Sequence, residues 1–151
     1  MREIKATNQS DFLEILENHI RDIANTFPHT IEAMLIPCIV DCSYENRSAI
    51  FELTVSENSK NFSGTLYGGV LAAIFDNVTG ILMRCYSGRY SSPTIELNMC
   101  FHRPAFVGDT MKIFVEIIST TTSFIDLYAV AYTKKRNNPV ASATVRYFLQ
   151  Q

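Results

Sequence analysis

The chain has 151 residues, a formal net charge of −2 and a pI of about 5.9, so its charge does not favour a nucleic acid partner. Hydrophobic residues make up 47% and charged residues 19%, the balance of a globular protein with a sizeable core. We therefore expect one globular domain over residues 1–151 that needs no disulfide or structural metal.

The N-terminal run, the longest apolar stretch and the cysteines indicate the cellular compartment of the protein. The opening run MREIKATNQSDF lacks the apolar core of a secretory signal, and its mixed charges are unlike a mitochondrial transit peptide. Residues 70–83, the longest apolar stretch, are too short and too interrupted to span a bilayer. Cysteines 38, 42, 85 and 100 form no CxxC pair, which favours buried free thiols over a metal site. These features predict a cytoplasmic protein with no membrane span, with mitochondrial import left as an alternative.

The first predicted element is an amphipathic helix over about residues 11–27. Apolar residues recur there at intervals of three and four, the spacing of one helix face. Asp11 followed by Glu14 resembles a capping box, and Pro28 ends the run. Packing against the body of the protein is the expected role.

Beyond Pro37 the spacing becomes that of strands. The clearest alternation covers residues 95–101, where every second side chain is apolar. Further β-rich runs cover residues 49–55, 111–119, 124–133 and 140–149. The last three runs have short connections, which predicts an antiparallel meander.

A second helix, over about residues 69–85, interrupts the strands. Its sequence VLAAIFDNVTGILMRCY is apolar on nearly every side, and such a helix must be buried on more than one face. The predicted fold is therefore α+β: a curved antiparallel sheet of five to six strands wrapped around one long central helix, with the amphipathic helix at the N-terminus.

One carboxylate, Asp76, lies inside this apolar helix. Aspartate is a poor helix former and is rarely buried without a partner. No Lys or Arg lies three or four residues away, where Ala72, Ala73, Thr79 and Gly80 stand. Asp76 therefore either bonds a distant group or faces a wet groove for structural reasons, or it has a chemical task, and the residues alone leave both interpretations open.

The start of the same helix offers hydrogen-bond donors. Gly68 and Gly69 let a ligand approach backbone N–H groups that have no partner at a helix N-terminus and lie at the positive end of the helix dipole. Such groups could bind a carbonyl oxygen on which negative charge develops. A simple tight turn is the alternative interpretation.

Helix geometry separates these two features. Gly68 and Asp76 are eight residues apart, or about 12 Å along a helix at about 1.5 Å per residue. One helix cannot place both groups on a single carbonyl, whereas two antiparallel copies can. The predicted site therefore lies at a homodimer interface, with Gly68 of one chain opposite Asp76 of the other.

With these residues in place, the chain resembles the hotdog-fold thioesterases, in the branch that acts on phenylacetyl-CoA and medium-to-long acyl-CoA. The helix signature of that family is close to N-x-x-G-x-x-H-G-G followed by an Asp, and here it is similar to Asn61, Gly64, Tyr67, Gly68-Gly69 and Asp76. The run SPTIELNMCFHRPAFVGD and the closing run PVASATVRYF also resemble strands of the family.

The resemblance implies an enzyme that hydrolyses acyl-CoA thioesters. Asp76 would be the general base, or a nucleophile that forms an anhydride. The Gly68 N–H would polarise the carbonyl, Asn61 of the partner chain would orient substrate or water, and the Thr94 hydroxyl would hold the attacking water. Family membership also implies a dimer of dimers, with no metal and no cofactor beyond the coenzyme A of the substrate.

Substrate contacts are predicted for Tyr67, Gly69 and Arg103, with Arg103 and residues 134–136 as candidate partners of the CoA phosphates. Tyr67 stands where most relatives have His, and a phenol with a reference pKa near about 10 cannot act as a near-neutral acid or base. A binding or regulatory protein without turnover is therefore the main alternative. A hotdog dehydratase ranks last, because no His lies near the helix start.

Overall fold

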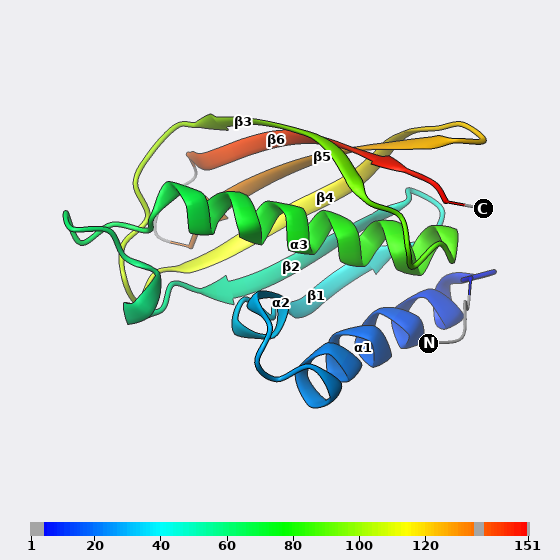
Figure 1. Ribbon diagram of the computed structural model, residues 1–151, viewed down its shortest axis with the longest axis horizontal. Coiled ribbons are helices and arrows are strands. Elements are labelled where there is room, and N and C mark those ends of the chain that lie inside the picture. Colours follow the sequence, from blue (N-terminus) through cyan, green and yellow to red (C-terminus); the bar gives the residue numbers. More distant parts are fainter. Residues whose placement is uncertain (1–4, 135–137, 151) are drawn as a thin grey trace.

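The computed structural model describes residues 5–134 and 138–150, and its centre is a six-stranded antiparallel sheet that curves around one long helix (Figure 1). Along the sheet the strands run in the order β1-β2-β4-β5-β6-β3. The helices are α1 (Gln9–Thr26), α2 (Ile31–Met34) and α3 (Gly68–Ser87), with a short 3-10 turn, η1, at Glu57–Ser59. The strands are β1 (Cys38–Ser43), β2 (Ser48–Thr54), β3 (Thr94–Phe101), β4 (Thr110–Thr120), β5 (Phe124–Thr133) and β6 (Pro139–Phe148).

The predicted architecture is confirmed. Strands β4, β5 and β6 are sequential neighbours, which makes them the expected meander. Strand β3 joins the free side of β6, so the connection through α3 carries the chain from β2 across the sheet to its opposite edge. Figure 1 shows α3 lying across the concave face, with α1 and α2 beside it on the β1 side.

Helix α3 is the core of the fold. Its buried residues point in all directions around the axis, because the curved sheet covers several of its faces. Gly88 ends the helix in the left-handed conformation, with φ 73°, where glycine carries no steric penalty. By length and hydropathy α3 could cross a membrane, but 61% of its apolar window is buried inside this fold.

Helix α1 begins earlier than predicted. The expected capping box at Asp11 and Glu14 is wrong: Asn8 is the N-cap, and its side chain accepts a hydrogen bond from the Asp11 N–H at 3.0 Å. Asparagine competes well with aspartate at this position, and it adds nearly one turn to the helix. The buried face of α1 packs against α3 and β1, as the apolar spacing predicts.

Strand β3 forms an edge of the sheet and is unusually exposed. Ile95 and Phe101 retain 51% and 59% of their accessible surface, although they belong to the most regular apolar alternation in the sequence. Leu97 and Met99 between them pack against the core, so the chain leaves the two ends of this apolar face uncovered. An unpaired edge strand with exposed apolar residues is a typical place for pairing with another chain.

The four cysteines are free, but the prediction that they are buried is wrong for most of them. Only Cys85, on the core helix, is buried, whereas Cys38 and Cys100 are exposed and Cys42 is intermediate. Both exposed thiols lie on the edge strands β1 and β3, whose side chains have no neighbouring strand on one side.

Candidate active site around Asp76

Asp76 lies near the middle of α3, and its carboxylate is held by two hydroxyl groups from the sheet. The Thr94 hydroxyl, at the start of β3, donates to Asp76 Oδ1 at 2.7 Å. The Tyr147 hydroxyl of β6 donates to the Asp76 carbonyl oxygen at 2.9 Å and lies 3.4 Å from Oδ1. In the described part of the chain, no hydrogen bond engages Oδ2 and no cation pairs with this carboxylate. One oxygen is thus anchored and the other is left for a ligand.

Tyr147 is the most deeply buried of these groups, with 1% of its surface exposed. Its hydroxyl also lies 2.8 Å from Thr79 Oγ1, and Thr79 donates in turn to the Phe75 carbonyl at 2.7 Å. Burial, reinforced by the negative charge of Asp76, raises the pKa of the Tyr147 phenol well above its ordinary value. Tyr147 therefore stays a neutral hydrogen-bond donor that fixes the position of Asp76.

Asp76 opens into a pocket of about 290 Å³. Ala73, Thr94 and Tyr147 form part of its wall, and α2 with the residue after it closes another side. The residues that line it are Ile31, Glu32, Leu35, Ala73, Asp76, Asn77, Arg84, Thr94 and Tyr147. A carboxylate beside apolar side chains in a concavity is the usual arrangement of a small-molecule site.

Two residues of α3 tie α2 to this pocket. Buried Asn77 donates through Nδ2 to the carbonyl oxygens of Glu32 at 3.3 Å and Leu35 at 3.2 Å. Arg84 forms an ion pair with Glu32 at 3.4 Å. The position of α2 is therefore set by the same helix that carries Asp76.

The predicted carbonyl-binding loop lies at the N-terminal end of α3. Tyr67 is the N-cap, but its side chain makes no capping bond, and the first turn contains no acidic residue. Among the described residues, the N–H groups of Gly68 and Gly69 have no hydrogen-bond partner, whereas the Leu71 N–H reaches the Tyr67 carbonyl at 3.0 Å. The Tyr67 ring packs so closely over Gly69 that a Cβ at position 69 would lie 2.7 Å from it. This helix start is open to an acceptor, and a side chain at position 69 would require the Tyr67 ring to move.

Asn61 shapes the loop before this helix. Its Oδ1 accepts from the N–H groups of Ser63 at 2.9 Å and Thr65 at 3.2 Å, and its Nδ2 donates to Thr65 Oγ1 at 2.9 Å. Gly64 completes the turn with φ 78°. Within one chain, Asn61 is thus engaged in its own turn and belongs to the loop end of α3, away from Asp76.

Arg103 lies near the same loop end. It lines a second pocket of about 290 Å³ together with Leu66, Leu71 and Phe101, and its side chain is exposed. The Phe101 ring lies 3.5 Å from where a Cβ of Gly68 would stand, so this pocket adjoins the helix start. Of the predicted basic cluster, Lys134 pairs with Glu52 at 3.1 Å, and residues 135 and 136 lie outside the described residues.

The predicted site residues therefore fall into two groups. Asp76 and Thr94 meet directly, whereas Asn61, Tyr67, Gly68, Gly69 and Arg103 gather at the N-terminal end of α3. Gly68 and Asp76 are eight residues apart in one continuous helix, which puts about 12 Å between the groups. A single chain does not bring them onto one reacting atom.

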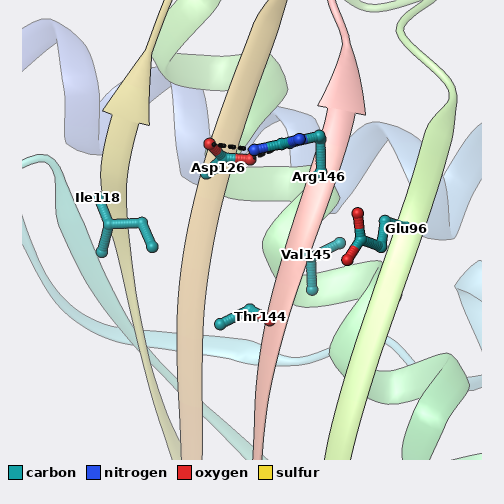
Figure 2. A pocket seen from close by; sticks show the side chains of 6 residues that line it. All are labelled: Glu96, Ile118, Asp126, Thr144, Val145 and Arg146. Carbon is teal, nitrogen blue, oxygen red and sulfur yellow. Dashed lines mark hydrogen bonds and ion pairs between the residues drawn. The ribbon is translucent and has the colours of Figure 1, made fainter.

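A further hollow lies on the opposite, outer face of the sheet, and Figure 2 shows it between the strands β3, β4, β5 and β6. An ion pair dominates it: Arg146 Nε lies 2.6 Å from Asp126 Oδ1, and Nη2 lies 3.1 Å from Oδ2. This arginine is already paired bidentately, so its side chain is not a free partner for a phosphate. In the described residues, no group of three His, Cys, Asp or Glu side chains is placed to hold a metal ion.

Comparison with known proteins identifies the family. Residues 63–140, which include the helix start, Asp76 and Thr94, match the thioesterase superfamily. The chain belongs to the thioesterase superfamily. Human and mouse acyl-coenzyme A thioesterase 13 are each 28% identical to this superfamily member over 69 residues, or 46% of this chain. The chain spans about half the length (49%) of these curated relatives.

Solved structures show that the fold of this superfamily member is the hotdog fold. Thioesterase superfamily member 2 from Mus musculus superimposes with a TM-score of 0.79 at 17% identity, over 95% of this chain and 100% of its own. A phenylacetic acid degradation-related protein from Ralstonia eutropha gives 0.74 at 22% identity, over 89% and 98%. A Streptococcus mutans protein solved with bound acetyl CoA gives 0.67 at 18% identity, over 76% and 88%.

Several residues that surround Asp76 were not identified by the sequence analysis. Tyr147 lies in a strand with ordinary alternation, so nothing local marks its contact with a helix 71 residues away. Asn77 and Thr79 did carry a signal, because they are polar residues beside Asp76 on an apolar helix. Arg84, seven residues beyond Asn77, lies two turns further along on the same side of the helix and could have been grouped with Asn77.

Proposed function

We propose that this chain hydrolyses acyl-CoA thioesters, with Asp76 as the general base. The observation that carries the proposal is the Asp76 carboxylate itself, which lines a pocket, is anchored at Oδ1 by the Thr94 hydroxyl and has no hydrogen bond at Oδ2 among the described residues. Membership of the thioesterase superfamily supports the reaction class. The names of the acyl-coenzyme A thioesterase relatives support coenzyme A as the leaving group.

The chemistry needs only groups that the chain supplies. Asp76 takes a proton from water as the water oxygen attacks the thioester carbonyl, and the Thr94 hydroxyl keeps the carboxylate aligned. Negative charge then develops on the carbonyl oxygen and is stabilised by the Gly68 N–H at the helix N-terminus. When the C–S bond breaks, the proton held by Asp76 passes to the CoA sulfur, which leaves a free acid and CoA. No metal or separate cofactor takes part.

Each site would contain two chains. The distance between Gly68 and Asp76 along α3 favours an antiparallel dimer in which the partner chain provides the carbonyl-binding loop. The exposed apolar side chains of Ile95 and Phe101 on β3 favour joining of the two sheets at this edge. Pairing of such dimers into tetramers is a further part of the proposal.

The remaining predicted residues would bind the substrate. Asn61 keeps the loop before Gly68 in shape, and Tyr67 and Gly69 border the path to its N–H groups. Arg103, exposed beside the same helix end, is placed to attract a CoA phosphate. The Streptococcus mutans protein solved with acetyl CoA shares this fold, which is consistent with a CoA ligand.

Thiol release from a panel of acyl-CoAs, from acetyl to long-chain and aromatic, tests the proposal. Wild type should release CoA from some members, and Asp76→Ala should lower kcat by about 100-fold or more, as expected for loss of a general base. Asp126→Ala, which removes a carboxylate from the outer face of the sheet, is the control and should keep wild-type turnover. Turnover retained by the Asp76 variant would mean that the site lies elsewhere.

A catalytically weak or inactive acyl-CoA-binding protein is the second candidate, and Tyr67 favours it. This phenol replaces the usual His of the family and packs over Gly69 at the predicted carbonyl site. The binding function predicts that wild type releases no thiol, while a non-hydrolysable acyl-CoA still raises its melting temperature. Tyr67→His would then be the variant expected to gain turnover.

A further inference from the structure

We infer that α2 is the wall against which the acyl group of the substrate lies, and that Ile31 determines which acyl groups are accepted. This inference rests on the proposed function, because it places an acyl-CoA thioester at Asp76. Ile31 itself lies outside the residues 61–76 signature. Ile31 comes instead from the segment between the N-terminal helix and the first strand, and the fold brings it to the pocket.

Ile31 is an apolar side chain at the rim of a pocket that contains a carboxylate. It lines the pocket with Leu35 and Asp76, yet 68% of its surface remains exposed. Leu35 and Ala33 face inward and pack against the core, so α2 presents one residue to the core side and another to the open side. An apolar ligand group beside Ile31 would remove this surface from water, which stabilises the complex by about 25 cal/mol per Å².

Pocket size makes the rim important. At about 290 Å³ the pocket is at the small end of ligand sites, which range over about 300–1,000 Å³. A short acyl group fits next to Asp76, whereas a longer or bulkier one must extend beyond the wall. The side chain at position 31 is what such a group meets there.

The wall is fixed in place, as a specificity element must be. Asn77 Nδ2 donates to two carbonyl oxygens of the segment, those of Glu32 and Leu35, and Arg84 pairs with the Glu32 side chain. Thr30 caps α2, accepting from the Ala33 N–H at 3.3 Å and donating to the Phe27 carbonyl at 2.8 Å. Since Asn77 follows Asp76 directly in the chain, the wall and the carboxylate are positioned by the same turn of α3.

Helix α2 itself offers a matched control for Ile31. Met34 is 71% exposed, close to the 68% of Ile31, but it does not line the pocket. Both side chains are apolar and belong to the four-residue helix α2. A substitution at Met34 therefore reproduces any general effect on α2 without changing the pocket.

The experiment measures kcat/KM for a series of acyl-CoAs of increasing acyl size with wild type, Ile31→Trp, Ile31→Ala and Met34→Trp. The Trp variant at position 31 should lower kcat/KM for the largest accepted acyl group about 10-fold or more relative to the smallest. Ile31→Ala should shift the preference towards larger groups, and Met34→Trp should reproduce the wild-type ratio. Size-exclusion chromatography of each variant checks that the assembly is unchanged.

Two results are distinguishable failures. If wild type hydrolyses acyl-CoAs but the Ile31 variants keep its ratio between large and small acyl groups, or Met34→Trp changes that ratio as much, α2 is not the acyl wall and the proposed function stands. If wild type releases no thiol from any acyl-CoA, the proposed function itself fails. In that case the inference fails with it.

Discussion

Two hydroxyl groups and one carboxylate define the chemistry at the scale of single residues. Oδ1 of Asp76 accepts a hydrogen bond from the Thr94 hydroxyl and lies 3.4 Å from the Tyr147 hydroxyl. The Asp76 side chain therefore cannot rotate without losing its contacts with β3 and β6. The same bonds explain how an aspartate is tolerated on a core helix that offers no counter-ion. They do not engage the second oxygen, and the proposed reaction takes place there.

The role of the Gly68 N–H can be tested by removing only that group. Gly68→Pro deletes the donor at the first helical position, where proline is well accommodated, and the preceding Tyr67 already has the extended conformation (φ −65°, ψ 130°) that proline requires. We expect kcat for acyl-CoA hydrolysis to fall about 100-fold or more, as for loss of an oxyanion-hole donor.

Gly68→Ala is the matched control for that measurement. It keeps the N–H, and its added Cβ makes an ordinary contact of 3.5 Å with Phe101. The alanine variant should therefore remain within a few-fold of wild type. Equal kcat values for the proline and alanine variants would remove Gly68 from the mechanism.

Tyr147→Phe tests the contribution of the buried hydroxyl to stability. The variant loses the bonds to Asp76 and Thr79 while keeping the packed ring, so the free energy of unfolding should fall by about 1–2 kcal/mol. In a chain of this size, thermal unfolding should show a drop of about 2–8 °C. A melting temperature equal to that of wild type would show that the hydroxyl does not hold Asp76.

Sequence reasoning reached the residues whose signal is local and missed those whose partners are remote. Asp76 stands out because it breaks the apolar pattern of its own helix, and the paired glycines mark the helix start. Tyr147 contacts Asp76 only because β6 passes behind α3, and the pairing order of a sheet is not written in the alternation of one strand. The α2 wall was also missed, because a helix of four residues is too short to show a periodic pattern.

At the scale of elements, the packing of α1 on the body of the fold depends on a buried histidine. His19 is 6% exposed and its ring lies 5.4 Å from that of Tyr90, while neither ring nitrogen has a hydrogen-bond partner in the described residues. Burial, and then the charge of Arg84, lower the pKa of His19 to about 4, against the opposing effect of Asp22. The fold therefore requires this ring to be neutral.

This depressed pKa predicts a loss of stability in acid. The unfolded chain binds the proton below about pH 6.5 and the folded chain only below about pH 4, so stability is complete above pH 6.5 and falls between these values. From about pH 7.5 to pH 5, the unfolding free energy of wild type should fall by about 2 kcal/mol more than that of His19→Gln. Urea titration at both pH values measures this change in unfolding free energy. The control His29→Gln, at an exposed position, should show the same change as wild type. Parallel pH profiles for wild type and His19→Gln would contradict the prediction.

The types and order of the long elements followed from sequence periodicity, whereas the short helix α2 and some element ends did not. The helix at residues 69–85 and the meander could be predicted because they are long. Over many residues an apolar pattern can be assigned clearly to a helix or to a strand. The start of α1 was misplaced because Asn8 and Asp11 both suit an N-cap, and only the hydrogen bond decides between them. The exposure of β3 was not predictable, because alternation shows which face is apolar and not what covers it.

At the scale of the whole molecule, the two groups of the proposed site lie on one helix, one at its N-terminus and the other near its middle. The Asp76 pocket and the free N–H groups at Gly68 lie about 12 Å apart along α3, and β3 leaves Ile95 and Phe101 uncovered at the edge. An antiparallel pair of chains would complete two sites and cover both edges at once. The central claim is therefore that catalysis belongs to the dimer.

Mixing two inactive variants tests this claim most directly. Asp76→Asn and Gly68→Pro are co-expressed with different tags, the doubly tagged species is isolated, and thiol release from the best acyl-CoA substrate is compared with that of each parent. A mixed dimer contains one site with both groups intact, so its turnover should recover to about half that of wild type. If the mixed dimer forms but remains as inactive as its parents, the two groups do not act together across the interface, and the account is wrong.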